Sequence, residues 1–385
     1  SFDVPAYAET HLATLRGAEG PLLQAGLAVR SGWLTSPISG GQSWLAHGTL
    51  ASGLRIDGQS RYGAMLASPR RTLFHLAREA GYRTVAVAPG ITRDWPEGQR
   101  LGFGRIHAAG DLGYRGPAFD WVTVPDQFTL AAADRLLAAV EGPSLAQITL
   151  LSSHAPWVPV PRMLPWDSLG DGSGFAAQVE GGETPEAVWS DTALIQDAYR
   201  RSIDYALQAV TADAARPRAR LPLTVVLGDH QPAPFVAQGA SRDVPVHLIG
   251  PPEVLALFDR WGWTPGFVPD ADLAAWPMES FRDRFLDAVS PAAPARPGPN
   301  RGGDAALVAA FGAIRRQLHR AGARLPARRG AGGGAEPRRS QRPGRAAGGG
   351  GAGGLPHLMG HRPAGCEERG GGKPRRPRGT AEDYK

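Results

Sequence analysis

The tripeptide Gly228-Asp229-His230 carries the clearest chemical pattern in this sequence. A carboxylate and an imidazole stand next to each other after an apolar run, and the glycine before them lets the backbone bend. Oxygen and nitrogen donors of this kind can face one divalent metal ion. The plainer alternative is an Asp that caps the next turn beside a surface His, because such pairs also arise by chance. The sequence leaves both interpretations open.

Ser43 follows Gly40 and Gly41 and precedes a run typical of a helix. A hydroxyl at a helix N-terminus lies near free N–H groups and the positive end of the helix dipole. That position favours an alkoxide and a bound phosphate or sulfate group. The alternative is an ordinary N-cap serine. His47 lies one helical turn after Ser43 and shares its face.

His154 follows a third apolar run and precedes Ala-Pro-Trp. Its imidazole could donate to a substrate oxygen or protonate a leaving group. The alternative is a histidine that is simply packed among aromatic rings. We interpret His75, His107 and His247 as structural, the last as a buried, hydrogen-bonded histidine within a strand.

The elements that must position these residues alternate between strands and helices. Apolar, β-rich runs predict strands at 27–33, 84–88, 121–124, 148–151, 223–227 and 244–249. Helical periodicity predicts helices at 43–51, 72–80, 129–140, 191–210, 253–261 and 278–289. Alternation of this kind predicts an α/β/α sandwich, and nearly all-apolar strands favour a mostly parallel central sheet. Ligand sites of such sheets lie at the carboxyl ends of strands, where the three segments occur.

Charge and composition divide the chain near residue 290. Residues 291–385 hold 17 Arg and 2 Lys against 6 acidic residues, whereas residues 1–290 hold 23 basic and 30 acidic residues. The later segment is also about one third Gly and Pro, so we expect a disordered, low-complexity tail. Its composition is typical of a shifted reading frame in a GC-rich gene. An Arg-rich tail with hardly any aromatic residues, none of them interleaved for base stacking, predicts no specific nucleic-acid partner.

Residues 1–290 are long enough for one large α/β domain. The one cysteine, Cys366, lies in the tail. A disulfide framework, a thiolate nucleophile and a cysteine-based zinc site are therefore excluded for the domain.

Taken together, these segments resemble the sulfatase-like branch of the alkaline phosphatase superfamily, and most closely its lipoteichoic-acid-synthase-like, membrane-anchored phosphotransferases. Residues 49–53 match the end of the sulfatase nucleophile motif, which places Ser43 at the nucleophile position and His47 at the position of the sulfatase Arg. Residues 153–157 match the substrate-facing His motif, and residues 228–230 match the Asp-His metal pair. The resemblance covers residues 20–290 and implies an alkaline-phosphatase-like fold.

The resemblance implies a metal-dependent hydrolase or transferase with Ser43 as nucleophile and His154 as a second catalytic residue. It also implies one divalent ion, Mn²⁺, Zn²⁺ or Mg²⁺, held by Asp229, His230 and Ser43. The Cys, Pro and Arg of the sulfatase motif are absent, so a phosphate ester is a better substrate than a sulfate ester.

The resemblance assigns substrate contacts to His47, Trp95 and Arg100. The synthase-like enzymes have a Trp-x-Arg pair here. In this sequence Glu97 stands at the Arg position, with Arg93 and Arg100 nearby.

The resemblance further implies an acidic metal ligand at the end of a first strand, ahead of the nucleophile loop. The acids before Ser43 are Asp3, Glu9 and Glu19, and none follows an apolar strand. We therefore expect an N-terminally truncated chain, soluble as given, that lacks this strand, its ligand and an upstream membrane segment.

For the full-length protein we expect membrane contact through that segment, at the extracytoplasmic (periplasmic) face of a bacterial inner membrane. The expected substrate is an anionic ester that is linked to a lipid or a glycan. An inactive or ligand-binding remnant of such an enzyme is the alternative.

Overall fold

The computed structural model describes residues 4–239 and 241–290, and the predicted tail lies outside them. The strands form a five-stranded sheet in the order β5-β6-β1-β7, in which β8 also pairs with β1, and a three-stranded sheet in the order β3-β2-β4. Their bounds are β1 (Ala28–Thr35), β2 (Arg83–Ala88), β3 (Arg105–Ala108), β4 (Ser144–Ile148), β5 (Thr224–Leu227), β6 (Asp243–Gly250), β7 (Thr264–Pro265) and β8 (Trp276–Pro277).

The prediction of an α/β chain is confirmed, but the prediction of a mostly parallel central sheet is wrong for the larger sheet. There β6 runs antiparallel to both β1 and β5, whereas β2, β3 and β4 are parallel to one another. The apolar run of β6 is buried from Val246 to Gly250 because helices cover both faces of the sheet. Coverage on both faces, and not parallel pairing, produces the continuous apolar pattern.

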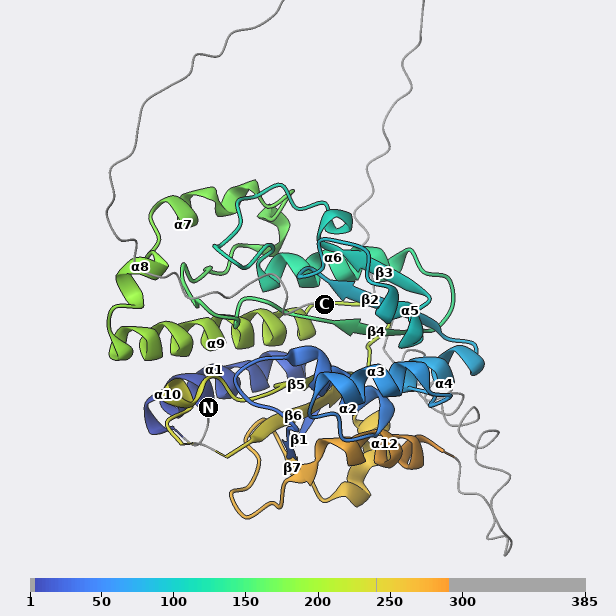
Figure 1. The fold of residues 1–385 in the computed structure, drawn as a ribbon. Helices are drawn as coiled ribbons and strands as arrows, with labels where there is room; N and C mark the ends of the chain where they lie inside the picture. The colour runs from blue at the N-terminus through green and yellow to red at the C-terminus, as the bar shows by residue number, and fades with distance from the viewer. Residues whose placement is uncertain (1–3, 240, 291–385) are drawn as a thin grey trace, which may run out of the picture. The chain divides into compact units, whose positions relative to one another are not determined.

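Helices lie on both faces of the sheets (Figure 1). Their bounds are α1 (Pro5–Gln24), α2 (Ser43–Ser52), α3 (Gln59–Ala67), α4 (Leu73–Glu79), α5 (Pro96–Arg100), α6 (Asp126–Ala138), α7 (Ala176–Glu180), α8 (Pro185–Val188), α9 (Thr192–Ala214), α10 (Pro234–Ala237), α11 (Pro252–Leu255) and α12 (Phe281–Val289). On one face α2, α3, α4 and α12 pack in a single cluster with residues of both sheets, among them Leu34 of β1 and Ala86 of β2. On the other face α6 covers the smaller sheet, while α1 and α9 cover the larger one.

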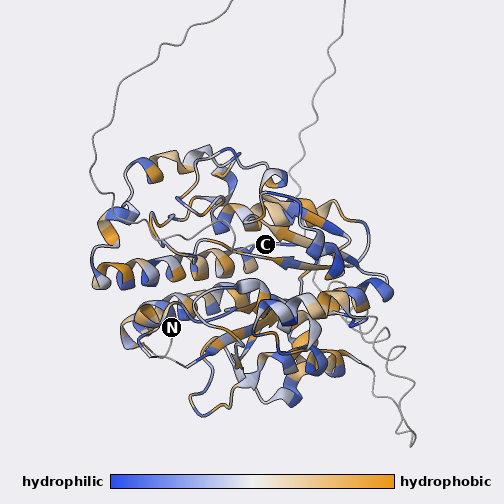
Figure 2. Cartoon of the chain, in the orientation of Figure 1, coloured by the Kyte–Doolittle hydropathy of each residue, from blue (hydrophilic) through white to orange (hydrophobic). Residues whose placement is uncertain are grey.

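Helix α9 shows why these segments become helices. Its buried residues recur at helical spacing, from Ile195 and Ala198 through Tyr205 to Ala209. Figure 2 shows the corresponding alternation of orange and blue along this helix. Asp191 caps its N-terminus by accepting N–H bonds from Ala193 and Leu194.

The structure contains two long helical segments that the sequence analysis did not assign. Helix α1 packs against α9 (Figure 1), with Leu15 and Leu22 almost fully buried. Helix α3 places Tyr62 and Met65 in the core. The predicted strand at 121–124 is wrong, since these residues contribute one isolated bridge from Val122 to Phe119. The predicted helix at 253–261 divides into α11 and a 3₁₀ turn.

Two apolar strands lie at sheet edges in the described part of the chain. There β4 pairs with β2 alone, and β5 pairs with β6 alone. All four residues of β5 are only partly buried, although they are Thr-Val-Val-Leu. Leu145 of β4 and Val225 of β5 pack against the same core cluster. Among the described residues, each of these strands therefore has a strand partner on one side only.

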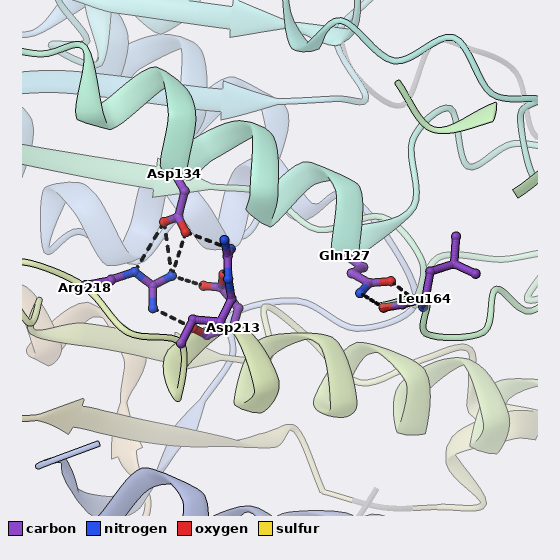
Figure 3. A network of polar contacts seen from close by, with 6 residues as sticks. Gln127, Asp134, Leu164, Asp213 and Arg218 are labelled. Carbon is purple, nitrogen blue, oxygen red and sulfur yellow. Dashed lines mark hydrogen bonds and ion pairs between the residues drawn. The ribbon is translucent and has the colours of Figure 1, made fainter. Parts of the chain in front are cut away.

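A polar network fastens α6 to the C-terminal end of α9 (Figure 3). Asp134 of α6 accepts from Arg216 at 2.9 Å and from Arg218 at 3.0 Å, and Asp213 of α9 accepts from Arg218 at 2.7 Å. At the N-terminal end of α6, the side chain of Gln127 forms two hydrogen bonds with the backbone of Leu164. Partly exposed ion pairs contribute little singly, about 0–1 kcal/mol, so the shared geometry matters more than any one pair.

In the part of the chain that the structure describes, no helix is both long enough and apolar enough to cross a bilayer.

We expect His247 to make the fold sensitive to acid. The side chain is 3% exposed within β6, and its Nδ1–H donates to Ser31 Oγ at 2.7 Å. Burial lowers the pKa of His247 to about 4, from 6.5 in the unfolded chain. The unfolded state therefore binds the proton first, and stability falls as the pH drops from 6.5 toward 4. Between pH 7 and pH 4 the unmodified protein should lose about 3 kcal/mol of unfolding free energy through His247, measured by chemical denaturation. The His247→Asn variant should not show this loss. Parallel pH profiles for the two proteins would contradict this.

Candidate active site

Ser43 directly follows a sharp turn between β1 and α2. Gly40, Gly41 and Gln42 all have positive φ, at 75°, 144° and 66°. Gln42 is a costly residue for a left-handed conformation, since its Cβ is crowded there. Strained backbone of this kind concentrates where a loop must present a side chain.

Ser43 is the first residue of α2 and not its N-cap. The N-cap is Gln42, and no side chain caps this helix end. The N-cap interpretation of Ser43 is therefore wrong, because the hydroxyl lies beside the first turn and does not accept from it. The uncapped N–H groups of a ten-residue helix remain available to an anionic group next to Ser43.

Backbone contacts hold the Ser43 loop against the loop that follows β5. Ser36 is fully buried and donates its hydroxyl to Asp229 O at 2.7 Å. Gly40 N–H donates to Gln231 O at 2.8 Å, and Ser39 forms a parallel bridge with Gln231. The sequence analysis missed Ser36 and Gln231, although a polar residue directly after an apolar strand was the pattern that could have indicated Ser36.

The two loops bring Ser43, Asp229 and His230 together. Ser43 Oγ lies 3.2 Å from His230 Nε2, which in turn lies 3.6 Å from Asp229 Oδ2. His230 Nδ1 lies 2.8 Å from Gln231 O, so this nitrogen carries the proton and donates it. Nε2 is then an acceptor that faces the Ser43 hydroxyl.

His47 completes the cluster from the next turn of α2. Its Nε2 lies 4.0 Å from Asp229 Oδ2. Burial lowers the pKa of His47, while the Asp229 charge opposes that shift. Burial would raise the pKa of Asp229, but the neighbouring His230 and His47 and the N–H bond from His230 to Asp229 Oδ1 outweigh it and leave the pKa lowered. Asp229 is thus an anion beside Ser43 at neutral pH.

His154 lies in the loop after β4. Its ring stacks on Trp121 with centroids 3.8 Å apart, and its Nδ1 lies 2.6 Å from Ala155 O. Trp157 of the same loop packs edge-on against Tyr199, whose pKa is raised by burial and also by the charge of Asp229. Through Trp157 the His154 loop therefore packs against α9. A role for His154 toward a substrate remains a prediction.

The structure does not join Trp95 or Arg100 to the cluster. Trp95 precedes α5 and packs on Phe103, with ring centroids 5.9 Å apart. Arg100 is exposed in the last turn of α5. Within residues 4–239 and 241–290, no hydrogen bond, ion pair or ring contact links either residue to Ser43, Asp229 or His230.

The donors around Ser43 fit a divalent cation in part. Ligands of a tetrahedral ion at about 2.1 Å are roughly 3.4 Å apart, close to the 3.2 and 3.6 Å that separate Ser43 Oγ, His230 Nε2 and Asp229 Oδ2. The Gln231 carbonyl orients the imidazole as an outer-shell partner does in metal sites. However, the described residues contain no group of three or more His, Cys, Asp or Glu that could hold a metal ion. A cation here would need a further ligand.

No protein-family profile and no curated protein sequence matches this chain. Among solved structures, the lipoteichoic acid synthase LtaP from Listeria monocytogenes is similar, with a TM-score of 0.40 and 12% identity over 61% of this chain and 58% of that one. A protein in the alkaline phosphatase superfamily from Vibrio parahaemolyticus is also similar, with a TM-score of 0.39 and 17% identity over 62% of this chain and 56% of that one. The chain thus spans less than three fifths of either structure.

Asp229 and His47 should be coupled through their charges. Because the Asp229 carboxylate opposes the lowering of the His47 pKa, Asp229→Asn should lower that pKa further. NMR titration of the His47 ring in the presence of a chelator measures it. Asp259→Asn, which alters an exposed pair with Arg30, is the matched control and should leave His47 unchanged. An unchanged or higher His47 pKa in Asp229→Asn would show that the two groups are not coupled.

Proposed function

We propose that this domain is built to transfer or hydrolyse a phosphate ester through Ser43. One observation carries the proposal: the Ser43 hydroxyl meets His230 Nε2 at 3.2 Å, at the uncapped N-terminus of α2. A nucleophile, a proton acceptor and free N–H donors for an oxyanion thereby occur in one place. A sulfate ester fits the same donors, but the plain serine favours phosphorus.

The chain's own residues account for the attack. In the cation-free site His230 Nε2 accepts the hydroxyl proton of Ser43, and the Gln231 carbonyl holds the ring in the required tautomer. Ser43 Oγ then bonds to phosphorus while the bond to the leaving alcohol breaks. The N–H groups at the start of α2 receive the negative charge of the phosphoryl oxygens. His154 is proposed to protonate the leaving oxygen, after which water or a hydroxyl acceptor releases the group.

A divalent cation, Mn²⁺, Zn²⁺ or Mg²⁺, is proposed as cofactor, held by Asp229, His230 and the Ser43 hydroxyl. When bound, it would take His230 Nε2 as a ligand and so replace that nitrogen as the group that activates the hydroxyl: it would lower the hydroxyl's pKa, so that the proton passes to water, and balance the charge of the ester. The further ligand is proposed to be a carboxylate on an additional strand. In the part of the chain that the structure describes, β4 and β5 each pair on one side only, which supports this because each strand leads into one of the loops that carry site residues.

The substrate is proposed to carry a lipid or a glycan on its ester. Two exposed aromatic residues support an apolar or sugar-binding surface beside the site. Trp189 is 39% exposed and Phe235 is 44% exposed, with ring centroids 6.4 Å apart. Trp189 Nε1 donates to Pro156 O in the His154 loop, and Phe235 lies in α10, shortly after His230. Membrane contact through an upstream segment, on the periplasmic side, is part of the same proposal, and His47, Trp95 and Arg100 remain its candidate substrate contacts.

Metal binding tests the cofactor. In calorimetric titrations of the full chain with Mn²⁺ or Zn²⁺ alone, Asp229→Ala should weaken binding by at least about tenfold, because it removes a charged donor. Asp259→Asn should bind like the unmodified protein. If neither ion shows binding that depends on Asp229, the inactive or ligand-binding remnant is the better account.

Covalent labelling tests the nucleophile. The full chain should be incubated with an activated aryl phosphodiester and Mn²⁺, and the peptide that contains Ser43 analysed by mass spectrometry. A phosphoryl adduct is expected on Ser43, absent from Ser43→Ala and retained in Ser39→Ala, which changes an exposed serine of the same loop. An adduct that survives in Ser43→Ala would place the nucleophile elsewhere, and no adduct in any protein would contradict catalysis by this chain.

A further inference from the structure

Asp126 is a fully buried carboxylate at the start of α6. Its Oδ1 accepts two backbone N–H bonds, from Leu151 and from Ser152, each at 2.8 Å. Burying a charged carboxylate is costly unless it is hydrogen-bonded, so both bonds must be formed for Asp126 to be tolerated there. The two donors belong to the first residues of the loop that carries His154.

A third bond makes the contact reciprocal. The N–H of Asp126 itself donates to Ser152 Oγ at 3.0 Å, and Ser152 is 3% exposed. The first turn of α6 and the residues after β4 are therefore joined at three points. Because α6 also packs on the smaller sheet, its N-terminus is a rigid support for this loop.

The same residues set the position of the His154 ring. His154 N–H donates to Leu151 O at 2.9 Å, which closes a turn directly on the segment that Asp126 holds. Trp157 Nε1 donates to Ser153 O at 2.9 Å and fixes the other side of that turn. The ring itself stacks on Trp121. Displacement of Leu151 and Ser152 would therefore move His154.

We propose that Asp126 is the positioning residue of the His154 loop: its buried carboxylate fixes the backbone of Leu151 and Ser152 and thereby holds His154 in place. The proposal deepens the proposed function, since His154 is the residue expected to act on the leaving group. Asp126 touches no reacting atom and acts through the loop alone.

The surroundings of Asp126 make its attachment to Leu151 and Ser152 dependent on pH. Its Oδ2 is buried and has no hydrogen-bond partner among the described residues. Burial raises the pKa of Asp126 to about 6, although the bonds from Ser152 and Leu151 act in the opposite direction. The titratable side chain that faces it from α9 is Tyr205, whose pKa is raised well above its usual value and which is therefore neutral. If the loop opened and exposed Asp126 to water, the carboxyl would regain its ordinary, lower pKa. Protonation near pH 6 therefore favours the closed arrangement, and the loop should open more readily as the pH rises through about 6.

Amide exchange in the full chain tests the proposal. Asp126→Ala should speed exchange at Leu151 and Ser152 by at least about tenfold and leave the amides of β2 unchanged. The matched control is Thr129→Val, which alters another buried polar residue of α6 and should change neither set. Equal rates at Leu151 and Ser152 in the two variants, or uniform acceleration of all amides, would overturn a positioning role.

A pH profile provides the second readout and remains usable if Asp126→Ala does not fold. In the unmodified protein, the corrected exchange rates at Leu151 and at Ser152 should change together near pH 6. In Asp126→Asn, which keeps a neutral acceptor, both should be independent of pH. A profile that persists in Asp126→Asn would refute the proposal. Neither readout requires catalysis, so failed metal binding or labelling with intact profiles would refute the proposed function alone.

Discussion

The pairing of β6 with both β1 and β5 is the constraint on which the candidate site depends. Since both neighbours run antiparallel to β6, β1 and β5 are parallel to each other and end at the same edge of the sheet. The register opposes Thr35 to Asp243 and Leu227 to Val246, so the loops that follow β1 and β5 start side by side. A slip of one residue would move every β6 side chain to the opposite face, so His247 would leave Ser31 and enter the apolar cluster that holds Val246 and Leu248, which makes the register strongly specified.

Hydrogen bonds between uncharged groups then hold the two adjacent loops together. Ser36 and Gly40 donate to the backbone of Asp229 and Gln231, and these bonds leave the Asp229 carboxylate and the His230 imidazole facing α2. The bent backbone before Ser43 is maintained because the sheet and α2 fix both of its ends. Backbone strain at a loop that presents a hydroxyl is thus supported by the packing around it.

A second support acts on His154 and arises from the smaller sheet. The first turn of α6 binds the residues after β4 through hydrogen bonds, and Tyr199 of α9 packs against Trp157 of the same loop. The network of Asp134, Asp213, Arg216 and Arg218 joins the two helices that deliver these contacts. The two halves of the proposed site are therefore held by elements that are themselves fastened together.

Local patterns in the sequence were enough to identify β1, β2, β5 and β6, the principal helices after residue 40, and the three loops with Ser43, His154 and the Asp229–His230 pair. The strand predicted at 148–151 lies at 144–148, and β3, β7 and β8 were not predicted. These features follow from apolar periodicity and from glycines beside polar residues, which act over a few positions. The antiparallel course of β6 could not be predicted, because a strand covered on both faces is apolar in either direction. The Ser36, Gln231 and Asp126 contacts join residues that are 25 to 193 positions apart in the chain. Only the tertiary structure brings such residues together, since their partners are set by strand register and helix packing and not by neighbouring sequence.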